Sequence, residues 1–221
     1  MQNNQYCGMT SYLKTYTHTF LIIFFLVCSV GLAQNDTSTI KAQVAVGINS
    51  PSGNGFVTNF EGNSVNFPSI NLGLQYMFKP LFGVKLDFGY NRFSNEDNTP
   101  EFKVNYSRIN AQLVYNTSSV LRFLPSRVGT FVHAGPGFTM IKPLSNYAQN
   151  NTSYINAIVG IEFHYGVSDK LSIFVDASYI KGFSKDFDPI TEGYGSFNGD
   201  LSAITVGVSI SLSGCYYCEN D

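Results

Sequence analysis

The chain has 221 residues, of which 44% are hydrophobic, 15% aromatic and only 13% charged. Its 13 Lys and Arg and 15 Asp and Glu give a net charge of −2, and the absence of a basic cluster argues against a nucleic-acid-binding surface. So apolar a chain is not disordered, and so few charges are unusual in a cytosolic enzyme. The 20 Gly, 14 Tyr and 19 Phe favour strands, with lipid as one candidate environment.

The N-terminal segment has the layout of a signal peptide. Its apolar run, residues 20–30, is too short to cross a bilayer as a helix. Lys14 and His18 precede the run, and small residues follow it at Gly31 and Ala33. We expect cleavage before Gln34, so that residues 1–33 are the signal peptide and residues 34–40 a short N-terminal lead.

Two alternatives concern this segment. Met9 could be the true start, because the residues before it add nothing that a signal needs. A lipoprotein signal would lipidate Cys28, but the preceding Phe25, Leu26 and Val27 are not the small residues that such a signal uses.

Cleavage would leave two cysteines, Cys215 and Cys218, in a C-terminal tail of residues 214–221. In an exported chain we expect this periplasmic tail to hold a disulfide or free thiols. Pairing with a partner and zinc binding are the alternatives, although a single C-x-x-C without a nearby His is a weak zinc pattern.

Apolar and polar residues alternate with period two along most of the remaining chain. The clearest runs are residues 70–78, 83–90, 171–179 and 203–212, and less regular ones are 41–49, 103–116, 128–141 and 153–165. Pro136 cannot donate to a strand ladder, so we expect a bulge or kink there. Eight such segments predict an all-β, eight-stranded antiparallel up-and-down transmembrane β-barrel over residues 41–213.

The connections alternate between short and long. Those near residues 79–81 and 166–169 are tight, whereas residues 50–66, 94–101, 142–152 and 182–199 form long polar loops. This layout is typical of a bacterial outer-membrane barrel. The exception is residues 117–127, which we interpret as a longer periplasmic excursion with a helical turn through residues 120–124.

Aromatic residues near the strand ends predict two interfacial girdles. They are Tyr90, Tyr106, Tyr154 and Tyr179 near the long loops, and Phe78, Phe82, Tyr115 and Tyr165 near the short turns. Tyr106 falls on the inward phase of the alternation. The polar set of the strands is mainly Gly, Ser, Asn and Thr, whereas a soluble barrel usually carries Lys and Glu there. A soluble lipocalin-like lipid-binding barrel is the alternative.

The last strand carries a polar-x-Gly-x-x-apolar-x-apolar pattern over residues 205–212, formed by Thr205, Gly207, Ile210 and Leu212. It resembles the signal that barrel-assembly machinery reads on a final strand. We therefore expect that machinery, and outer-membrane lipid, among the partners.

The strand of residues 132–138 and the strand-turn-strand unit of residues 159–179 are similar to those of the small outer-membrane β-barrel family, of the outer-membrane protein A and X type. The resemblance implies an eight-stranded barrel in the outer membrane. Because family members serve as anchors, adhesins, small pores and secretion accessories, it implies no single activity. We expect a structural or surface-interaction role, with a transport or secretion accessory as the alternative.

Charged residues on the inward phase should pair inside so narrow a barrel. They are Lys85, Asp87, Arg108, His133, Glu162, His164 and Asp176, with Gln75, Asn110 and Gln112 between them. We expect Arg108 to contact Glu162 or Asp176, and the lumen to be filled or narrowly gated.

Barrels that act on lipid A acyl chains use His with Ser or Asp. His133, His164, Asp176 and Ser178 supply these residue types, but no spacing marks them as a triad. We predict no enzymatic activity, cofactor or metal.

Residues 182–199 combine acidic and aromatic side chains, as binding loops often do. The candidate residues for an extracellular ligand are Asp186, Phe187, Asp188, Glu192, Tyr194 and Phe197, with the aromatics exposed. The acids do not form a twelve-residue calcium loop. A plain solvated loop is the alternative.

Overall fold

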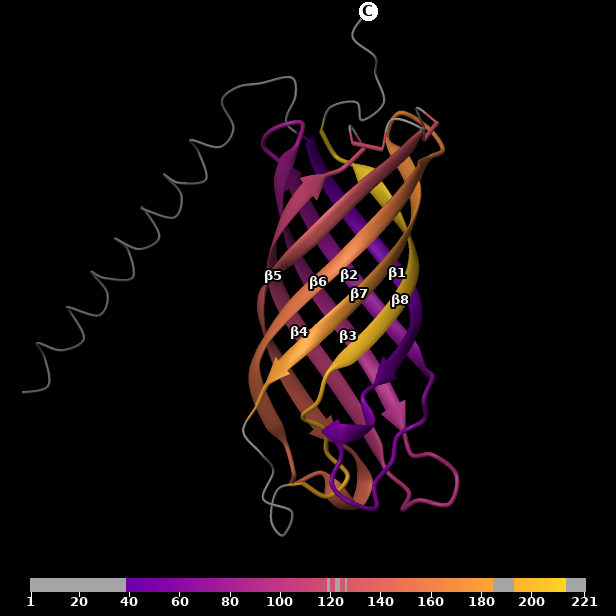
Figure 1. Ribbon diagram of the computed structural model, residues 1–221, viewed down its shortest axis with the longest axis vertical. Coiled ribbons are helices and arrows are strands. Elements are labelled where there is room, and N and C mark those ends of the chain that lie inside the picture. Colours follow the sequence, from indigo (N-terminus) through magenta and orange to yellow (C-terminus); the bar gives the residue numbers. More distant parts are fainter. Residues whose placement is uncertain (1–38, 119, 122–123, 126, 185–192, 214–221) are drawn as a thin grey trace, which may run out of the picture. The chain divides into compact units, whose positions relative to one another are not determined.

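The computed structural model describes residues 39–118, 120–121, 124–125, 127–184 and 193–213. These residues form one closed antiparallel barrel in which each strand pairs with the next along the chain and β1 pairs with β8 (Figure 1). The predicted fold class is confirmed. The strands are β1 (Thr39–Pro51), β2 (Asn66–Met77), β3 (Phe82–Ser94), β4 (Lys103–Asn116), β5 (Val128–Pro143), β6 (Thr152–Gly166), β7 (Leu171–Phe183) and β8 (Leu201–Ser211).

The two rims of the barrel differ as the sequence predicts. Short connections follow β2 and β6, while the loops after β1, β3, β5 and β7 lie at the other rim (Figure 1). Two 3-10 helices, η1 (Gly53–Gly55) and η2 (Ser145–Tyr147), lie in the long loops. Among the described residues, no helix is long and apolar enough to cross a membrane.

The connection between β4 and β5 holds turn hydrogen bonds. The N–H groups of Val120 and Leu121 both donate to the carbonyl of Thr117, at 3.0 and 3.3 Å. The N–H of Leu124 also donates to the carbonyl of Leu121, at 3.0 Å. Residues 122 and 123 lie outside the described residues, so the helical turn expected over residues 120–124 stays a prediction.

The bulge expected at Pro136 is absent. The β5–β6 register is unbroken there, and the β4–β5 pairs Asn110↔Gly137 and Leu113↔Ala134 keep one register on both sides of it. A Cβ on Gly135 would clash with the backbone carbonyl oxygen of Ala111, so the missing side chain lets the two backbones approach. The register shift of this sheet lies in β1 instead, between Gly47 and Asn49.

The two faces of the wall have opposite character. Outward positions carry exposed apolar side chains, such as Val44, Leu113 and Ile155, whereas inward positions carry buried polar ones, such as Gln43 and Asn110. This is the reverse of a soluble barrel, whose apolar set is inside. A continuous exposed apolar surface of this kind is suited to lipid.

The girdle at the short-turn rim matches the expectation. Its four aromatic residues are exposed, and Phe82 and Tyr115 pack with ring centroids 5.1 Å apart. At the long-loop rim the prediction is wrong for Tyr106 and Tyr154, which are buried inside the barrel because both occupy inward positions of their strands. Tyr179 is exposed and Tyr90 is half-buried on the outer face.

Candidate functional site

Three layers of side chains fill the lumen. The aromatic mouth lies at the long-loop end and consists of the buried residues Phe56, Phe60, Phe93, Phe102, Val104, Tyr106, Ile141, Tyr154, Ile158, Ile180, Phe197 and Leu201. The ionic middle contains the seven inward charged and histidine residues predicted from the sequence, all of them buried. The apolar base, Met77, Val114 and Phe131, lies at the short-turn end.

Arg108 anchors the mouth side of the ionic middle. Its Nη1 lies 2.5 Å from Asp87 Oδ2 and 3.0 Å from Asn110 Oδ1, and its Nη2 donates to Asn71 Oδ1 at 3.1 Å. The expected contact with Glu162 or Asp176 is wrong. Arg108 is paired across the sheet with Gly89, and a Cβ there would lie 2.6 Å from the guanidinium carbon. Because Gly89 has no side chain, the Arg108 guanidinium can lie over it and reach Asp87 on the neighbouring strand β3.

Glu162 is the centre of the next group. Lys85 on β3 forms an ion pair with it across the lumen, since Glu162 belongs to β6. Glu162 Oε2 also accepts hydrogen bonds from His164 Nε2 at 2.8 Å and Gln43 Nε2 at 3.2 Å. Carboxylate and ammonium are therefore both desolvated and paired, as buried charges must be.

Aromatic rings connect this group to the base, since Phe131 belongs to the base. The imidazole of His164 stacks on Phe174 with centroids 4.9 Å apart and meets the edge of Phe131 at 5.1 Å. The Lys41 ammonium lies 4.9 Å from the centre of the Phe131 ring, a cation–π distance.

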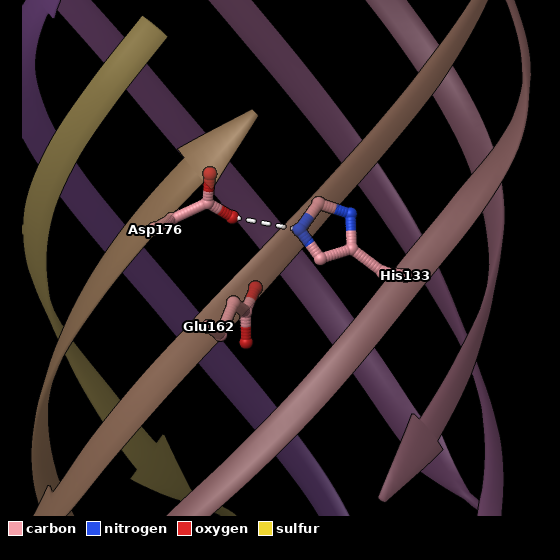
Figure 2. A group of neighbouring side chains, drawn as sticks. All are labelled: His133, Glu162 and Asp176. Atoms are coloured by element: carbon pink, nitrogen blue, oxygen red, sulfur yellow. Dashed lines mark ion pairs between the residues drawn. The ribbon is translucent and has the colours of Figure 1, made fainter. Parts of the chain in front are cut away.

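His133 and Asp176 form the third group, shown in Figure 2. His133 Nε2 lies 2.9 Å from Asp176 Oδ2, and its Nδ1 lies 2.5 Å from Gln112 Oε1. Ser178 donates a hydrogen bond to the other oxygen of Asp176. The carboxylate thus lies between serine and histidine, whereas a nucleophilic triad needs the histidine in the middle. This order of residues differs from that of a Ser-His-Asp triad.

His133, Glu162 and Asp176 are also the residues that could hold a metal ion (Figure 2). Each offers one ligand atom within 4.8 Å of the others, and all three are buried. The Lys85 ammonium already pairs with Glu162, however. A metal ion would enter next to this cation, which opposes its binding.

The mouth is built by side chains from several loops. Phe56 and Phe60 come from the β1–β2 loop, Phe102 from the β3–β4 loop and Phe197 from the β7–β8 loop. The Phe197 ring lies 4.9 Å from Phe56 and 5.0 Å from Phe93, between centroids.

The expected exposure of the loop aromatics is therefore wrong for Phe197, which is fully buried, and right for Tyr194, which is 40% exposed. Asp186, Phe187, Asp188 and Glu192 lie outside the described residues, as do Cys215, Cys218 and residues 1–33.

Sequence reasoning missed part of this interior. Lys41 and Gln43 are buried in the lumen, and the inward phase of β1 could have placed them there. No such signal exists for the loop residues of the mouth, which follow no alternation. They are Phe56, Phe60, Phe102 and Phe197.

Three solved structures have the same fold. They are Neisserial surface protein A (14% identity, covering 78% of this chain and 96% of that one, TM-score 0.53), a major outer membrane protein from Thermus thermophilus (10%, 79% and 99%, 0.55) and the outer membrane protein AlkL in lipid bilayers (13%, 85% and 96%, 0.52). The chain has the fold of the small outer-membrane β-barrels. No protein-family model and no curated protein sequence matches it.

Proposed function

We propose that the protein is an exported, integral outer-membrane barrel with a closed lumen, which acts without enzymatic activity as a structural or surface-interaction protein. The filling of the lumen by three layers carries this proposal. An ion passing through would have to part the rings around Phe197 and then the Lys85–Glu162 pair. The fold, the exposed apolar outer face and the signal-like residues 1–33 support the location.

Conductance in planar bilayers tests the closed lumen. The purified full chain should give no steady current above that of the protein-free bilayer. Membrane fractionation and heat-modifiable gel migration test the location. A steady open channel in the wild type would contradict the proposal, as would recovery of the folded chain in a soluble fraction.

A gated small pore is the second candidate, favoured by the Lys85–Glu162 ion pair, which crosses the lumen from β3 to β6. Replacing both partners, as Lys85→Gln with Glu162→Gln, removes the pair without leaving an unpaired charge. Conductance in this double variant alongside a closed wild type would favour gating, and silence in both favours a permanent plug.

We infer that the long-loop rim is the surface that meets an external partner, because the connection that carries the candidate residues leaves β7 and enters β8 at that rim. These residues are Asp186, Phe187, Asp188, Glu192 and Tyr194. Phe197 is excluded from this set, because it is buried in the aromatic mouth. A pull-down should therefore compare the full chain with a variant that lacks residues 185–192 but keeps residues 193–199. Equal capture by both would exclude this loop.

We further propose that barrel-assembly machinery recognises residues 205–212. Ile210 and Leu212 are exposed on the outer side, which supports this. Replacing Ile210 and Leu212 by Ser should slow membrane assembly, and the matched change of Val206 and Val208 to Ser serves as the control. Equal assembly rates for the two variants would exclude a specific signal.

A further inference from the structure

A row of cations crosses the outer face of the barrel at the long-loop rim. Arg92 on β3, Lys103 on β4 and Lys142 on β5 are exposed and occupy outward positions. In the register, Arg92 pairs with Asn105 and Asn105 pairs with Lys142, so Arg92 and Lys142 lie on one line across three strands. Lys103 lies one outward position from Asn105 along β4, level with Ser94. Because neighbouring strands are about 4.8 Å apart, Arg92 and Lys142 are separated by about 10 Å of backbone.

No carboxylate among the described residues forms an ion pair with this row. The outward positions of β3, β4 and β5 carry no Asp or Glu. Within the described part of the chain, none of the three cations forms an ion pair. Lys181 on β7 is the contrast, since its ammonium lies 2.7 Å from Asp200 Oδ2. The row is therefore available to an external anion.

The depth of the row matches a lipid headgroup. Two outward positions from Arg92 and Lys142, and three from Lys103, the surface is apolar at Phe88, Phe138 and Ile109, all of them exposed. Tyr90 marks the boundary, and its hydroxyl donates to Asn105 Oδ1 at 2.8 Å, where Arg92 Nε also donates at 3.0 Å. Cations directly above a lipid-facing surface meet the phosphate groups of the bilayer.

A polar groove adjoins the row. It has a volume of about 530 Å³ and is lined by Met140, Ile141, Gln149, Asn150, Asn151, Thr152 and Ser153. Met140 lies one outward position from Lys142 on β5. Uncharged amides and hydroxyls of this kind are hydrogen-bonding partners for sugar hydroxyls, and phosphate is the natural partner of the cations.

We propose that Arg92, Lys103 and Lys142, together with the groove beside them, bind the headgroup of a phosphorylated glycolipid in the outer leaflet. The phosphate lies on the cations, the sugar faces the amides of the groove, and the acyl chains run down the apolar outer face. This inference rests on the proposed outer-membrane location, with the long loops outside.

Binding of fluorescent lipopolysaccharide to the full chain in neutral detergent micelles tests the cations. The variant is Arg92→Gln/Lys103→Gln/Lys142→Gln. Its matched control is Lys79→Gln/Arg127→Gln/Lys170→Gln, which removes the same charges from exposed residues at the short-turn rim. We expect the first triple to weaken binding by on the order of 10- to 100-fold and the control by less than about twofold. An equal effect of both triples, or none of the first, would overturn the proposal.

Two further binding measurements identify which part of the glycolipid is recognised. Dephosphorylated lipopolysaccharide should bind the wild type about as weakly as intact lipopolysaccharide binds the first triple. The variant Gln149→Ala/Asn151→Ala should weaken lipopolysaccharide binding but leave phosphatidylglycerol binding unchanged, while Asn54→Ala/Asn146→Ala, outside the groove, changes neither. Equal binding of phosphatidylglycerol and lipopolysaccharide to the wild type would overturn the glycolipid assignment. Because binding is measured on protein that migrates as folded, these results are independent of bilayer conductance and of membrane fractionation.

Discussion

The ionic middle and the aromatic mouth fill the same lumen by different means. The middle is made by strand residues alone, and its contacts join basic to acidic side chains: Arg108 with Asp87, Lys85 with Glu162 and His133 with Asp176. The mouth is made by ring packing, and several of its rings come from loops. Removing one partner in the middle leaves a buried charge, whereas removing one ring in the mouth leaves a space that loops can partly close.

The largest effect is expected in the middle. Arg108→Met leaves the Asp87 carboxylate buried without its cation, so the free energy of unfolding should fall by about 3–5 kcal/mol. The double variant Arg108→Met/Asp87→Asn should regain more than half of that loss. Urea unfolding in micelles followed by far-UV circular dichroism measures both, since the chain has no Trp for fluorescence. Additive losses in the double variant would mean that the pair is not coupled.

In the mouth, Phe197→Ala should lower the free energy of unfolding by about 3 kcal/mol. This is the low end for truncation of a buried Phe, because the loop that carries residue 197 can relax into the space. The loss should be local. The bond from Asn198 N–H to the Gly55 carbonyl, 3.0 Å long, ties two loops together, and its hydrogen exchange should accelerate. Tyr194→Ala, which changes a half-exposed ring, is the control and should have a smaller effect. Acceleration throughout the strands would show that mouth and middle unfold together.

Substitutions at two glycines compare the wall around the middle with a loop of the mouth. Gly135→Ala, in the wall around the middle, drives a Cβ into the backbone carbonyl oxygen of Ala111, so we expect a loss of about 1–3 kcal/mol in unfolding free energy. Gly53→Ala, in a loop of the mouth, has no heavy atom within 4 Å of the new Cβ and should be close to neutral. Equal stability of the two variants would show that β4 and β5 can separate at little cost.

The smallest effect concerns the rim above the mouth. Burial alone would raise the pKa of Asp200, but hydrogen bonds from Lys181, Tyr179 and the Gly182 N–H outweigh it and hold that pKa below its usual value. A lowered pKa in the folded state means that the contribution of Asp200 to stability is present above about pH 3.9, the value of an unfolded Asp. It is lost as the pH falls through the lower, folded value.

Asp200→Asn should therefore unfold more easily than the wild type at about pH 6, and the difference should shrink on acidification to below about pH 3. Because Lys181 is largely exposed, salt should reduce the difference as well. A difference that grows toward low pH would reverse the assigned direction of the pKa shift.

The sequence predicted the middle far better than the mouth. Alternation decides which strand residues face inward, so Glu162 and Asp176 could be placed without coordinates. The partner of Arg108 could not, because it depends on the register of β3 against β4 and on the space above Gly89. Phe197 was expected outside because a loop has no period from which its direction can be inferred.

The pairing of β1 with β8, from Lys41↔Ser211 to Pro51↔Leu201, has a consequence for how the chain is made. Until residues 201–211 are synthesised and delivered, β1 and β7 have open edges, and every unpaired peptide group in a bilayer costs several kcal/mol. A chain that stops before β8 therefore has no stable resting state in lipid. Insertion has to wait for the last strand, and a nonsense mutation just before residue 201 should be as damaging as one near the start of the gene.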